Sequence, residues 1–481
     1  MRLVHAAGEL GEAIAGARRE AQSAFGNDTL MLERLIERGR HIEIQVFADA
    51  HGKAVHLGER DCTAQRRRQK VIEEAPSPVV SPAMRAAMGR DAVAAALAVG
   101  YRGAGTVEFI VDEKLKHYFL EMNPRLQVEH PVTEMITGLD LVEWQLRVAA
   151  GEPLPLTQEQ VQFSGHAIEA RLYAEDPYAG FAPQTGTVLH WQPGSATAHA
   201  GIRIDAGIAE GGEVSPWYDP LLAKVIAHGR DRGDAIRRLM AALEDAPLLG
   251  LANNARFLRD LIDHSRFHAA TMHTALLDEW AAGGEALLQR PVPDDELWCL
   301  AAAVAVGRGA RPASVAGFDL SLECGATRRT LRVELGAGSV HVDLGATRHE
   351  VELGAEQKGW LDYRCDGIRR RIALVRDGGR LHFSRAAAGF VFAEVSSFPA
   401  VDAAHDASRV RSPVAGTVTR VLVASGDRVV AGQTVACVEA MKMEMKLVAA
   451  AASRVGAVRV KTGDQIASGA VLVELENDKE A

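Results

Sequence analysis

The sequence predicts a multidomain α+β protein that ends in a small β sandwich, and three observations lead to this fold class. The chain has 481 residues, which is too many for one hydrophobic core, so three or four domains are expected. Its first half alternates helical and strand patterns, as in an α+β domain with an antiparallel sheet. Residues from 411 onward contain an internal repeat, which is typical of a two-fold β sandwich.

Composition excludes several classes of protein. Hydrophobic residues make up 47% and charged residues 24%, the balance of an ordinary globular protein. The net charge is −9 and no basic tail is present, so nucleic acid is not an expected partner. The 5 cysteines are scattered, which favours a reducing compartment, the cytoplasm or the mitochondrial matrix. The most apolar run, residues 297–307, is far shorter than the ~20 residues of a membrane span and predicts a buried helix.

The N-terminal region predicts helices and antiparallel strands. Apolar residues at helical spacing predict a helix over 30–38. Residues 41–48 alternate strictly, which predicts a strand with His41, Glu43 and Gln45 on one face. The other elements expected here are a strand through residue 57, a helix over 82–100 and a strand pair over 106–112 and 116–123.

The middle of the chain changes from a mixed pattern to a β-rich one. Residues 151–280 predict strands over 165–172 and 221–228 and a helix over 233–243. Between 292 and 401, one helix is followed by short alternating strands, which predict a β-rich barrel or sandwich. Residues 401–410 lack periodicity and are interpreted as a linker.

The C-terminal domain repeats itself with an offset of 37 residues. Seven residues of the first copy, Val418, Val421, Val423, Gly426, Asp427, Gly432 and Glu439, recur as Val455, Val458, Val460, Gly463, Asp464, Gly469 and Glu476. Between the two halves lies the segment EAMKMEM, where a turn is expected to place Lys442 at the tip of a hairpin. Taken alone, Met441 and Met443 could be core residues and Lys442 an ordinary solvated lysine.

The Ala-Met-Lys-Met tetrapeptide between two symmetric halves resembles biotin carrier domains. The resemblance implies that a biotin protein ligase attaches biotin covalently to Lys442, which becomes a long arm with a ureido ring at its end. Lipoyl domains share the fold, but they usually flank the lysine with acidic residues and lack the paired methionines.

Long segments of the N-terminal half resemble the ATP-grasp portion of biotin carboxylases, in the same order and through about residue 285. They read HIEIQVFAD, GERDCTAQRRRQKVIEEAPSP, GYRGAGTVEF, FLEMNPRLQVEHPVTEMITGLDLVEWQLRVAAG and GHAIEARLYAEDP. The resemblance implies that ATP activates bicarbonate for the carboxylation of biotin.

The residues themselves suggest a metal site. Glu108 and Glu121 lie on adjacent predicted strands, with Asn123 on the same face as Glu121. Oxygen ligands in this arrangement suit Mg²⁺ or Mn²⁺ at the phosphates of ATP. Considered alone, the pair could equally be two solvated carboxylates on a strand pair.

The resemblance also assigns roles to individual residues. It implies that bicarbonate is held by Lys70, Arg125, Gln127 and the backbone of Val128. It implies catalytic roles for Arg125, for Glu129 as the base that deprotonates bicarbonate, and for Arg171 as the group that stabilises charge on the biotin ureido oxygen. The expected ATP-binding residues are Glu33, Ile36, His41, Gln65 and Arg68.

One of these positions departs from the family. Arg68 stands where the family commonly has histidine, although both side chains can donate to a nucleotide. Without the family, residues 66–68 would be interpreted as a solvated charge cluster, and His41 and His130 as structural histidines.

These patterns divide the chain into five parts. They are an ATP-grasp domain over 1–150 that lacks its N-terminal part, a biotin carboxylase C-terminal domain over 151–285, a β-rich subunit-docking domain over 290–400, a linker over 401–410 and a biotinyl carrier domain over 411–478. Met1 matches the family just after its glycine-rich phosphate loop. The expectation is therefore an N-terminally truncated chain that is biotinylated but does not carboxylate biotin by itself.

Carboxylase, β-rich and carrier parts in one chain resemble α subunits of acyl-CoA carboxylases, most of all those of 3-methylcrotonyl-CoA carboxylases, through AEDPYAGFAPQTGTVLHWQPG and SPWYDPLLAKVIAHG. This implies a hetero-oligomer with a carboxyltransferase β subunit and a role in leucine degradation. The alternatives are a geranyl-, propionyl- or acetyl-CoA carboxylase α subunit, a non-catalytic biotin carrier module, and an unrelated ATP-grasp ligase fused to a lipoyl domain.

Overall fold

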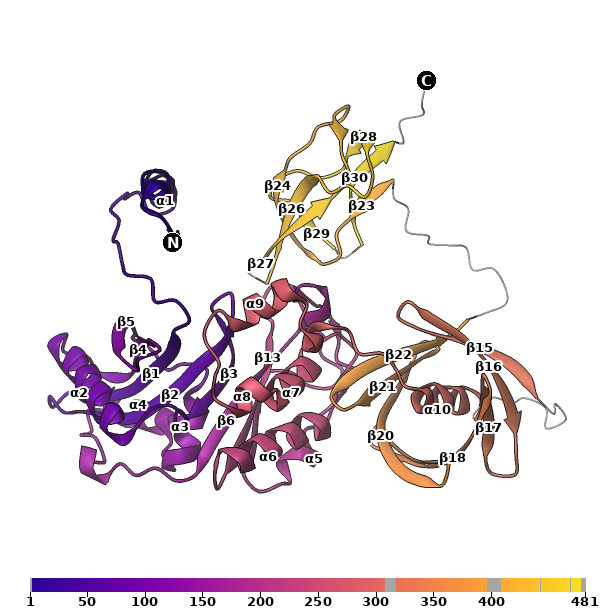
Figure 1. The fold of residues 1–481 in the computed structure, drawn as a ribbon, viewed down its shortest axis with the longest axis horizontal. Helices are drawn as coiled ribbons and strands as arrows, with labels where there is room; N and C mark the ends of the chain where they lie inside the picture. The colour runs from indigo at the N-terminus through magenta and orange to yellow at the C-terminus, as the bar shows by residue number, and fades with distance from the viewer. Residues whose placement is uncertain (1, 308–316, 396–407, 442, 468, 477–481) are drawn as a thin grey trace.

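The computed structural model describes residues 2–307, 317–395, 408–441, 443–467 and 469–476. Figure 1 shows a large sheet with its helices, a barrel and a separate C-terminal sandwich. The predicted fold class, a multidomain α+β chain with an ATP-grasp-like first half and a β-rich second half, is confirmed. No helix among the described residues is long and apolar enough to span a bilayer.

An antiparallel sheet of eight strands, in the order β11-β13-β6-β3-β2-β1-β4-β5, forms the first half of the molecule. Its strands are β1 (Arg40–Ala48), β2 (Ala54–Arg66), β3 (Gln69–Ala75), β4 (Gly103–Val111), β5 (His117–Asn123), β6 (His166–Tyr173), β11 (Ile202–Ala206) and β13 (Leu221–Gly229). Short two-stranded ladders flank it: β7 (Glu175–Asp176) with β8 (Ala182–Pro183), β9 (Gly186–Thr187) with β12 (Glu213–Val214), and β10 (His190–Trp191) with β14 (Leu248–Leu249).

Helices flank this sheet, except α1, which lies apart from it, and some of them begin at a side-chain cap. They are α1 (Leu10–Phe25), α2 (Pro82–Ala98), α3 (His130–Thr137), α4 (Leu141–Ala149), α5 (Gly194–Thr197), α6 (Arg232–Asp245), α7 (Ala255–Asp263), α8 (Ser265–His268) and α9 (Leu276–Gly283). The Ser81 hydroxyl accepts from Met84 N–H to start α2, and Asp231 accepts from Asp234 N–H to start α6. Helix α2 packs against β1 and β2, and α6 packs against β13 and β6.

The predicted helix over 30–38 is wrong. Residues 27–36, between α1 and β1, are not helical, and only a short turn follows at residues 37–38. Met31 and Leu32 are 79% and 72% exposed, so their side chains have no surface to cover. Because a short helix takes most of its stability from packing, helical spacing without a packing surface does not produce one.

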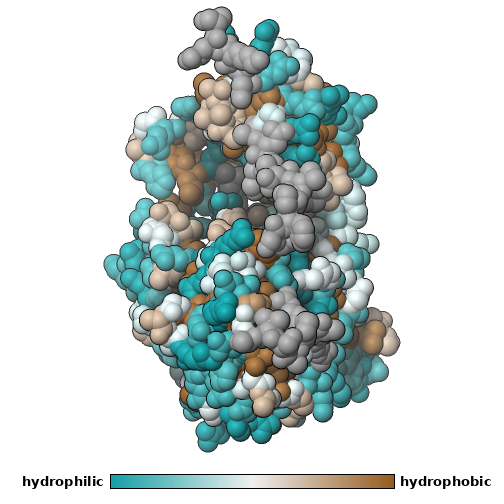
Figure 2. All heavy atoms as spheres, turned by 90° about the vertical axis from the view of Figure 1, so that its right-hand side faces the viewer, coloured by the Kyte–Doolittle hydropathy of each residue, from teal (hydrophilic) through white to brown (hydrophobic). Residues whose placement is uncertain are grey.

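The middle region is a closed barrel that encloses a helix. The barrel strands are β15 (Phe318–Cys324), β16 (Thr327–Leu335), β17 (Val340–Leu344), β18 (Thr347–Gln357), β19 (Trp360–Cys365), β20 (Ile368–Asp377), β21 (Arg380–Arg385) and β22 (Ala388–Glu394). Helix α10 (Asp295–Val306) is buried on every side from residue 297 to 304, which places it inside the barrel. Trp298 packs edge-on against Phe392 with ring centroids 4.9 Å apart. The outside of this end of the molecule is mainly hydrophilic (Figure 2).

The C-terminal sandwich consists of two four-stranded sheets that follow the sequence repeat. Its strands are β23 (Arg409–Arg411), β24 (Gly416–Val421), β25 (Arg428–Val429), β26 (Thr434–Ala440), β27 (Met443–Val448), β28 (Ser453–Val458), β29 (Gln465–Ile466) and β30 (Val471–Glu476). A shift of 37 residues carries β24, β25 and β26 onto β28, β29 and β30. The predicted two-fold sandwich is therefore the observed one.

Most of the predicted linker over 401–410 lies outside the described residues. Its last part is wrong, because Arg409 and Val410 belong to β23 and pair with β30.

Candidate active site

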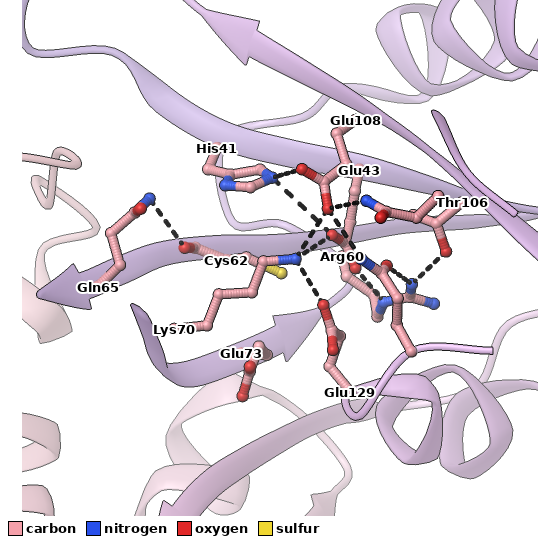
Figure 3. A network of polar contacts seen from close by, with 12 residues as sticks. His41, Glu43, Arg60, Cys62, Gln65, Lys70, Glu73, Thr106, Glu108 and Glu129 are labelled. Carbon is pink, nitrogen blue, oxygen red and sulfur yellow. Dashed lines mark hydrogen bonds and ion pairs between the residues drawn. The ribbon is translucent and has the colours of Figure 1, made fainter. Parts of the chain in front are cut away.

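One face of the large sheet carries charged side chains from four neighbouring strands (Figure 3). His41 and Glu43 come from β1, Arg60 from β2, Lys70 from β3 and Glu108 from β4. The antiparallel register places Glu43 directly between Arg60 and Glu108. Because side chains alternate along a strand, these residues share one face, and Ile42, Ile44 and Val46 of β1 lie on the other.

Lys70 lies at the centre of this network. Its Nζ donates to Glu129 Oε1 at 2.5 Å, to Glu43 Oε2 at 2.6 Å and to Glu108 Oε1 at 3.2 Å. Burial would lower the pKa of Lys70, but its anionic neighbours raise the pKa above its usual value. The side chain therefore remains an ammonium among three carboxylates.

Arg60 ties the network to the sheet through a fully buried guanidinium. It donates to Glu43 Oε1 at 2.6 Å. Its other acceptors are Gln45 at 2.7 Å, Thr133 at 3.0 Å, Thr106 at 3.1 Å and Gln127 at 3.2 Å. Burial would raise the pKa of Glu43, but Lys70 and Arg60 hold it at about 2. Glu43 and Arg60 thus form a buried ion pair whose remaining donors are satisfied.

Glu129 connects two cations. It lies immediately before α3, and its Oε2 accepts from Arg171 Nη2 at 2.9 Å while its Oε1 accepts from Lys70. Arg171 extends from β6 and also donates to Glu73 Oε1 at 2.5 Å. A carboxylate between an ammonium and a guanidinium is well placed to take a proton from an anion that both cations attract.

Glu108, Glu121 and Asn123 lie together on β4 and β5. Asn123 Nδ2 donates to Glu108 Oε1 at 3.0 Å and to Glu121 Oε1 at 3.3 Å. Burial would raise the pKa of Glu108, but His41, whose Nε2 lies 3.0 Å from Glu108 Oε2, lowers it. Two carboxylates and an amide form a donor set that fits Mg²⁺ or Mn²⁺, which prefer oxygen ligands.

The residues expected to hold bicarbonate are brought together only in part. Gln127 is buried and donates to Glu108 Oε1 at 2.8 Å. The carbonyl oxygen of Val128 accepts from Lys224 Nζ at 3.0 Å. The side chain of Arg125 is exposed, and its Nη1 donates to the Leu126 carbonyl at 3.4 Å.

The residues expected to bind the nucleotide also differ in their placement. His41 belongs to the network, and Gln65 is buried with its Nε2 at 3.5 Å from the Cys62 carbonyl. Glu33 is exposed and Ile36 half-buried in the segment that precedes β1. Arg68 lies exposed in the turn between β2 and β3, where its φ is 68°.

Sequence reasoning missed several members of the site. Glu43, Arg60, Glu73, Glu169 and Lys224 received no role. A signal was available, because strict alternation had already placed Glu43 on the same face as His41. A row of ionisable residues on the polar face of a strand in the middle of a large sheet indicates buried charge.

Lys442 itself lies outside the described residues. The strands on either side of it pair as a hairpin, with Ala440 opposite Met443. Met441 is buried, but it packs with core residues of the first half of the chain rather than those of its own sandwich. Its N–H donates to the Pro216 carbonyl at 3.3 Å, so the hairpin end contacts the first half of the chain (Figure 1).

Three family models match successive parts of the chain. Residues 1–157 match the ATP binding domain of the carbamoyl-phosphate synthase L chain, residues 169–279 the biotin carboxylase C-terminal domain, and residues 408–475 the model described as biotin-requiring enzyme. An ATP-binding half and a biotinyl sandwich in one chain define a biotin-dependent carboxylase subunit.

Similar proteins of known function show which family within this class the chain belongs to. The mitochondrial methylcrotonoyl-CoA carboxylase subunit alpha of Arabidopsis thaliana is 36% identical, over 99% of this chain and 72% of its own length. The propionyl-CoA carboxylase alpha chain of Ruegeria pomeroyi is 37% identical, over 97% of this chain and 74% of its own. The chain belongs to the family of biotin-dependent acyl-CoA carboxylase α subunits.

A solved structure resembles the first half. The biotin carboxylase domain of the Hydrogenobacter thermophilus 2-oxoglutarate carboxylase, in complex with MgADP and bicarbonate, superimposes with a TM-score of 0.56 at 42% identity. The match covers 60% of this chain and 63% of that one.

Proposed function

We propose that this protein carboxylates biotin with ATP and bicarbonate at the Lys70–Glu129–Arg171 site and carries that biotin on Lys442. The placement of Glu129 between two cations, Lys70 and Arg171, carries the proposal. Lys70 attracts and holds the bicarbonate anion, and Glu129 takes its proton. Arg171 then donates to the negative charge that develops beside it.

Two bound groups complete this chemistry. Biotin supplies the ureido nitrogen that accepts the carboxyl group, and Mg²⁺ or Mn²⁺ neutralises the phosphates of ATP. Glu108, Glu121 and Asn123 would hold the metal ion. His41 and Gln65 would contact the nucleotide together with Glu33, Ile36 and Arg68, and Gln127, Arg125 and the Val128 backbone would contact bicarbonate.

The finer assignments are part of the same proposal. The acyl acceptor is 3-methylcrotonyl-CoA, carboxylated on a separate carboxyltransferase β subunit in the cytoplasm or mitochondrial matrix, and a biotin protein ligase modifies Lys442. The parts are an ATP-grasp domain over 1–150, a biotin carboxylase C-terminal domain over 151–285, a subunit-docking barrel over 290–400 and a carrier over 411–478. Methylcrotonoyl-CoA carboxylases among the relatives support this acceptor, and propionyl-CoA is the second candidate for the same reason.

Two measurements test the proposal. An avidin blot of the full chain should be positive and should become blank for Lys442→Arg, with Lys446→Arg on the same hairpin as the matched control. With ATP and Mg²⁺, label from isotopic bicarbonate should be incorporated by a chain that is extended before Met1 with the glycine-rich loop of the family. The labelled chain is then mixed with the β subunit and each acyl-CoA in turn. An undiminished blot for Lys442→Arg contradicts attachment of biotin at Lys442. The absence of labelled product with every acyl-CoA contradicts the proposed carboxylation.

A further inference from the structure

Two glutamates face each other beside Arg171 and take no part in the chemistry above. Glu73 on β3 and Glu169 on β6 are directly opposite in the antiparallel register, and both side chains are fully buried. Arg171 donates to Glu73 Oε1 at 2.5 Å. Among the described residues, Glu73 Oε2 and both carboxyl oxygens of Glu169 have no hydrogen-bond partner.

Two negative charges are unfavourable in this position. Residues opposite each other on antiparallel strands have Cβ atoms about 5 Å apart, and a buried pair of carboxylates cannot readily ionise twice. Burial raises the pKa of Glu169 well above its usual range, and Glu73 raises it further. Burial also raises the pKa of Glu73 to about 7, although Arg171 opposes the shift.

The other charged groups near Glu73 and Glu169 do not compensate for the repulsion between two buried carboxylates. Glu129, in the segment before α3, adds to the negative potential at both carboxyls. Lys70 on β3 and Lys224 on β13 oppose it. Lys70 is bound to three other carboxylates, and Lys224 is engaged by the Val128 carbonyl and by Asp205 at 3.3 Å. Neither lysine donates to Glu169 in the described structure.

We propose that Glu73 and Glu169 together carry one proton and one negative charge, and that the pair positions Arg171. Glu169 holds the proton, and the charged Glu73 fixes the guanidinium against Glu129. When Glu73 takes a second proton from solvent, Arg171 loses one of its two anionic partners and is free to leave this position. The pair is a positioning element for the group that, under the proposed function, serves biotin.

The test reads the protonation of the pair and the state of Arg171 directly, in the full chain. The infrared carbonyl band of buried carboxylic acid should be present at neutral pH and lose intensity in Glu169→Gln. The Arg171 Nε–H signal, assigned in the NMR spectrum by its loss in Arg171→Lys, should titrate as Glu73 is protonated. In Glu73→Gln this titration should disappear, because the titrating carboxyl is gone. In Glu169→Gln the midpoint should stay near the wild-type value, because a neutral amide replaces a neutral carboxylic acid.

Glu74→Gln is the matched control, because Glu74 is the next residue on β3, is buried, and pairs instead with His166 and Arg232. It should leave the Arg171 midpoint unchanged. The proposal is overturned if wild-type protein lacks the carboxylic acid band, or if the Arg171 signal is independent of pH between about 5 and 9. These wild-type readings stand even where Glu169→Gln fails to fold. Neither reading requires turnover, so a missing carboxylase activity contradicts the proposed function alone.

Discussion

The large sheet and the barrel both consist of eight antiparallel strands, yet they bury opposite kinds of side chain. The sheet buries a network of carboxylates, arginines and a lysine on one face, and the barrel encloses the apolar helix α10. Burying charge is unfavourable unless each charge is paired, whereas burying apolar surface is favourable by itself. This difference indicates that the sheet performs the chemistry and that the barrel has a structural role.

The largest expected effect is in the barrel. Trp298→Ala removes a fully buried indole and should lower the free energy of unfolding of the barrel by about 3–5 kcal/mol. Denaturant titration with a probe in the barrel measures this change, with the exposed Trp217→Ala as control. A loss below about 1 kcal/mol would show that α10 is not part of a packed core.

A similar loss is expected in the sheet, for a different reason. Arg60→Met leaves the buried Glu43 with only one of its two cations, Lys70, and should cost about 3 kcal/mol. The double variant Arg60→Met/Glu43→Gln should recover part of that loss, because the incompletely neutralised charge is gone. Additive losses in the two variants would contradict the coupling, as measured by a double-mutant cycle.

The sheet and the barrel should differ more in their effect on catalysis than in their effect on stability. Glu129→Gln keeps the shape of the side chain but removes the base, so biotin carboxylation should fall by about 10²-fold or more. Glu143→Gln, on the exposed side of α4, is the matched control. Isotopic bicarbonate incorporation by the extended chain measures both, and near-normal incorporation by Glu129→Gln would show that the base lies elsewhere.

The smallest expected effect is a loss of stability of the sheet at low pH. The folded-state pKa of Glu43 is about 2, below the roughly 4.3 of an unfolded chain. Its ionisation therefore stabilises the fold fully above about pH 4.3, and this contribution is lost as pH falls through about 2. Hydrogen exchange on acidification should show β1 amides losing protection before those of α10. If the β1 and α10 amides lose protection at the same pH, the stability of the sheet does not depend on its buried charges more than that of the barrel does.

The sequence predicted those elements whose pattern repeats locally. The 37-residue repeat, the alternation of β1 and the apolar run of α10 each depend on short-range spacing, and all three appear as expected. The helix over 30–38 failed because its spacing says nothing about whether a packing surface is present. Glu73 and Glu169 were missed because they lie 96 residues apart and meet only through the pairing of β3 with β6.

The symmetry of the C-terminal sandwich relates the hairpin to the place where the chain enters the domain. The repeat carries the end of β26, next to the hairpin turn, onto the end of β30, where the chain leaves the domain. Strand β23, where the chain enters, pairs with β30 at that same pole. The hairpin end lies at the opposite pole, toward the carboxylase half (Figure 1). A rotation of the sandwich about its β23 end therefore moves the hairpin end through the longest arc that the length of the domain permits.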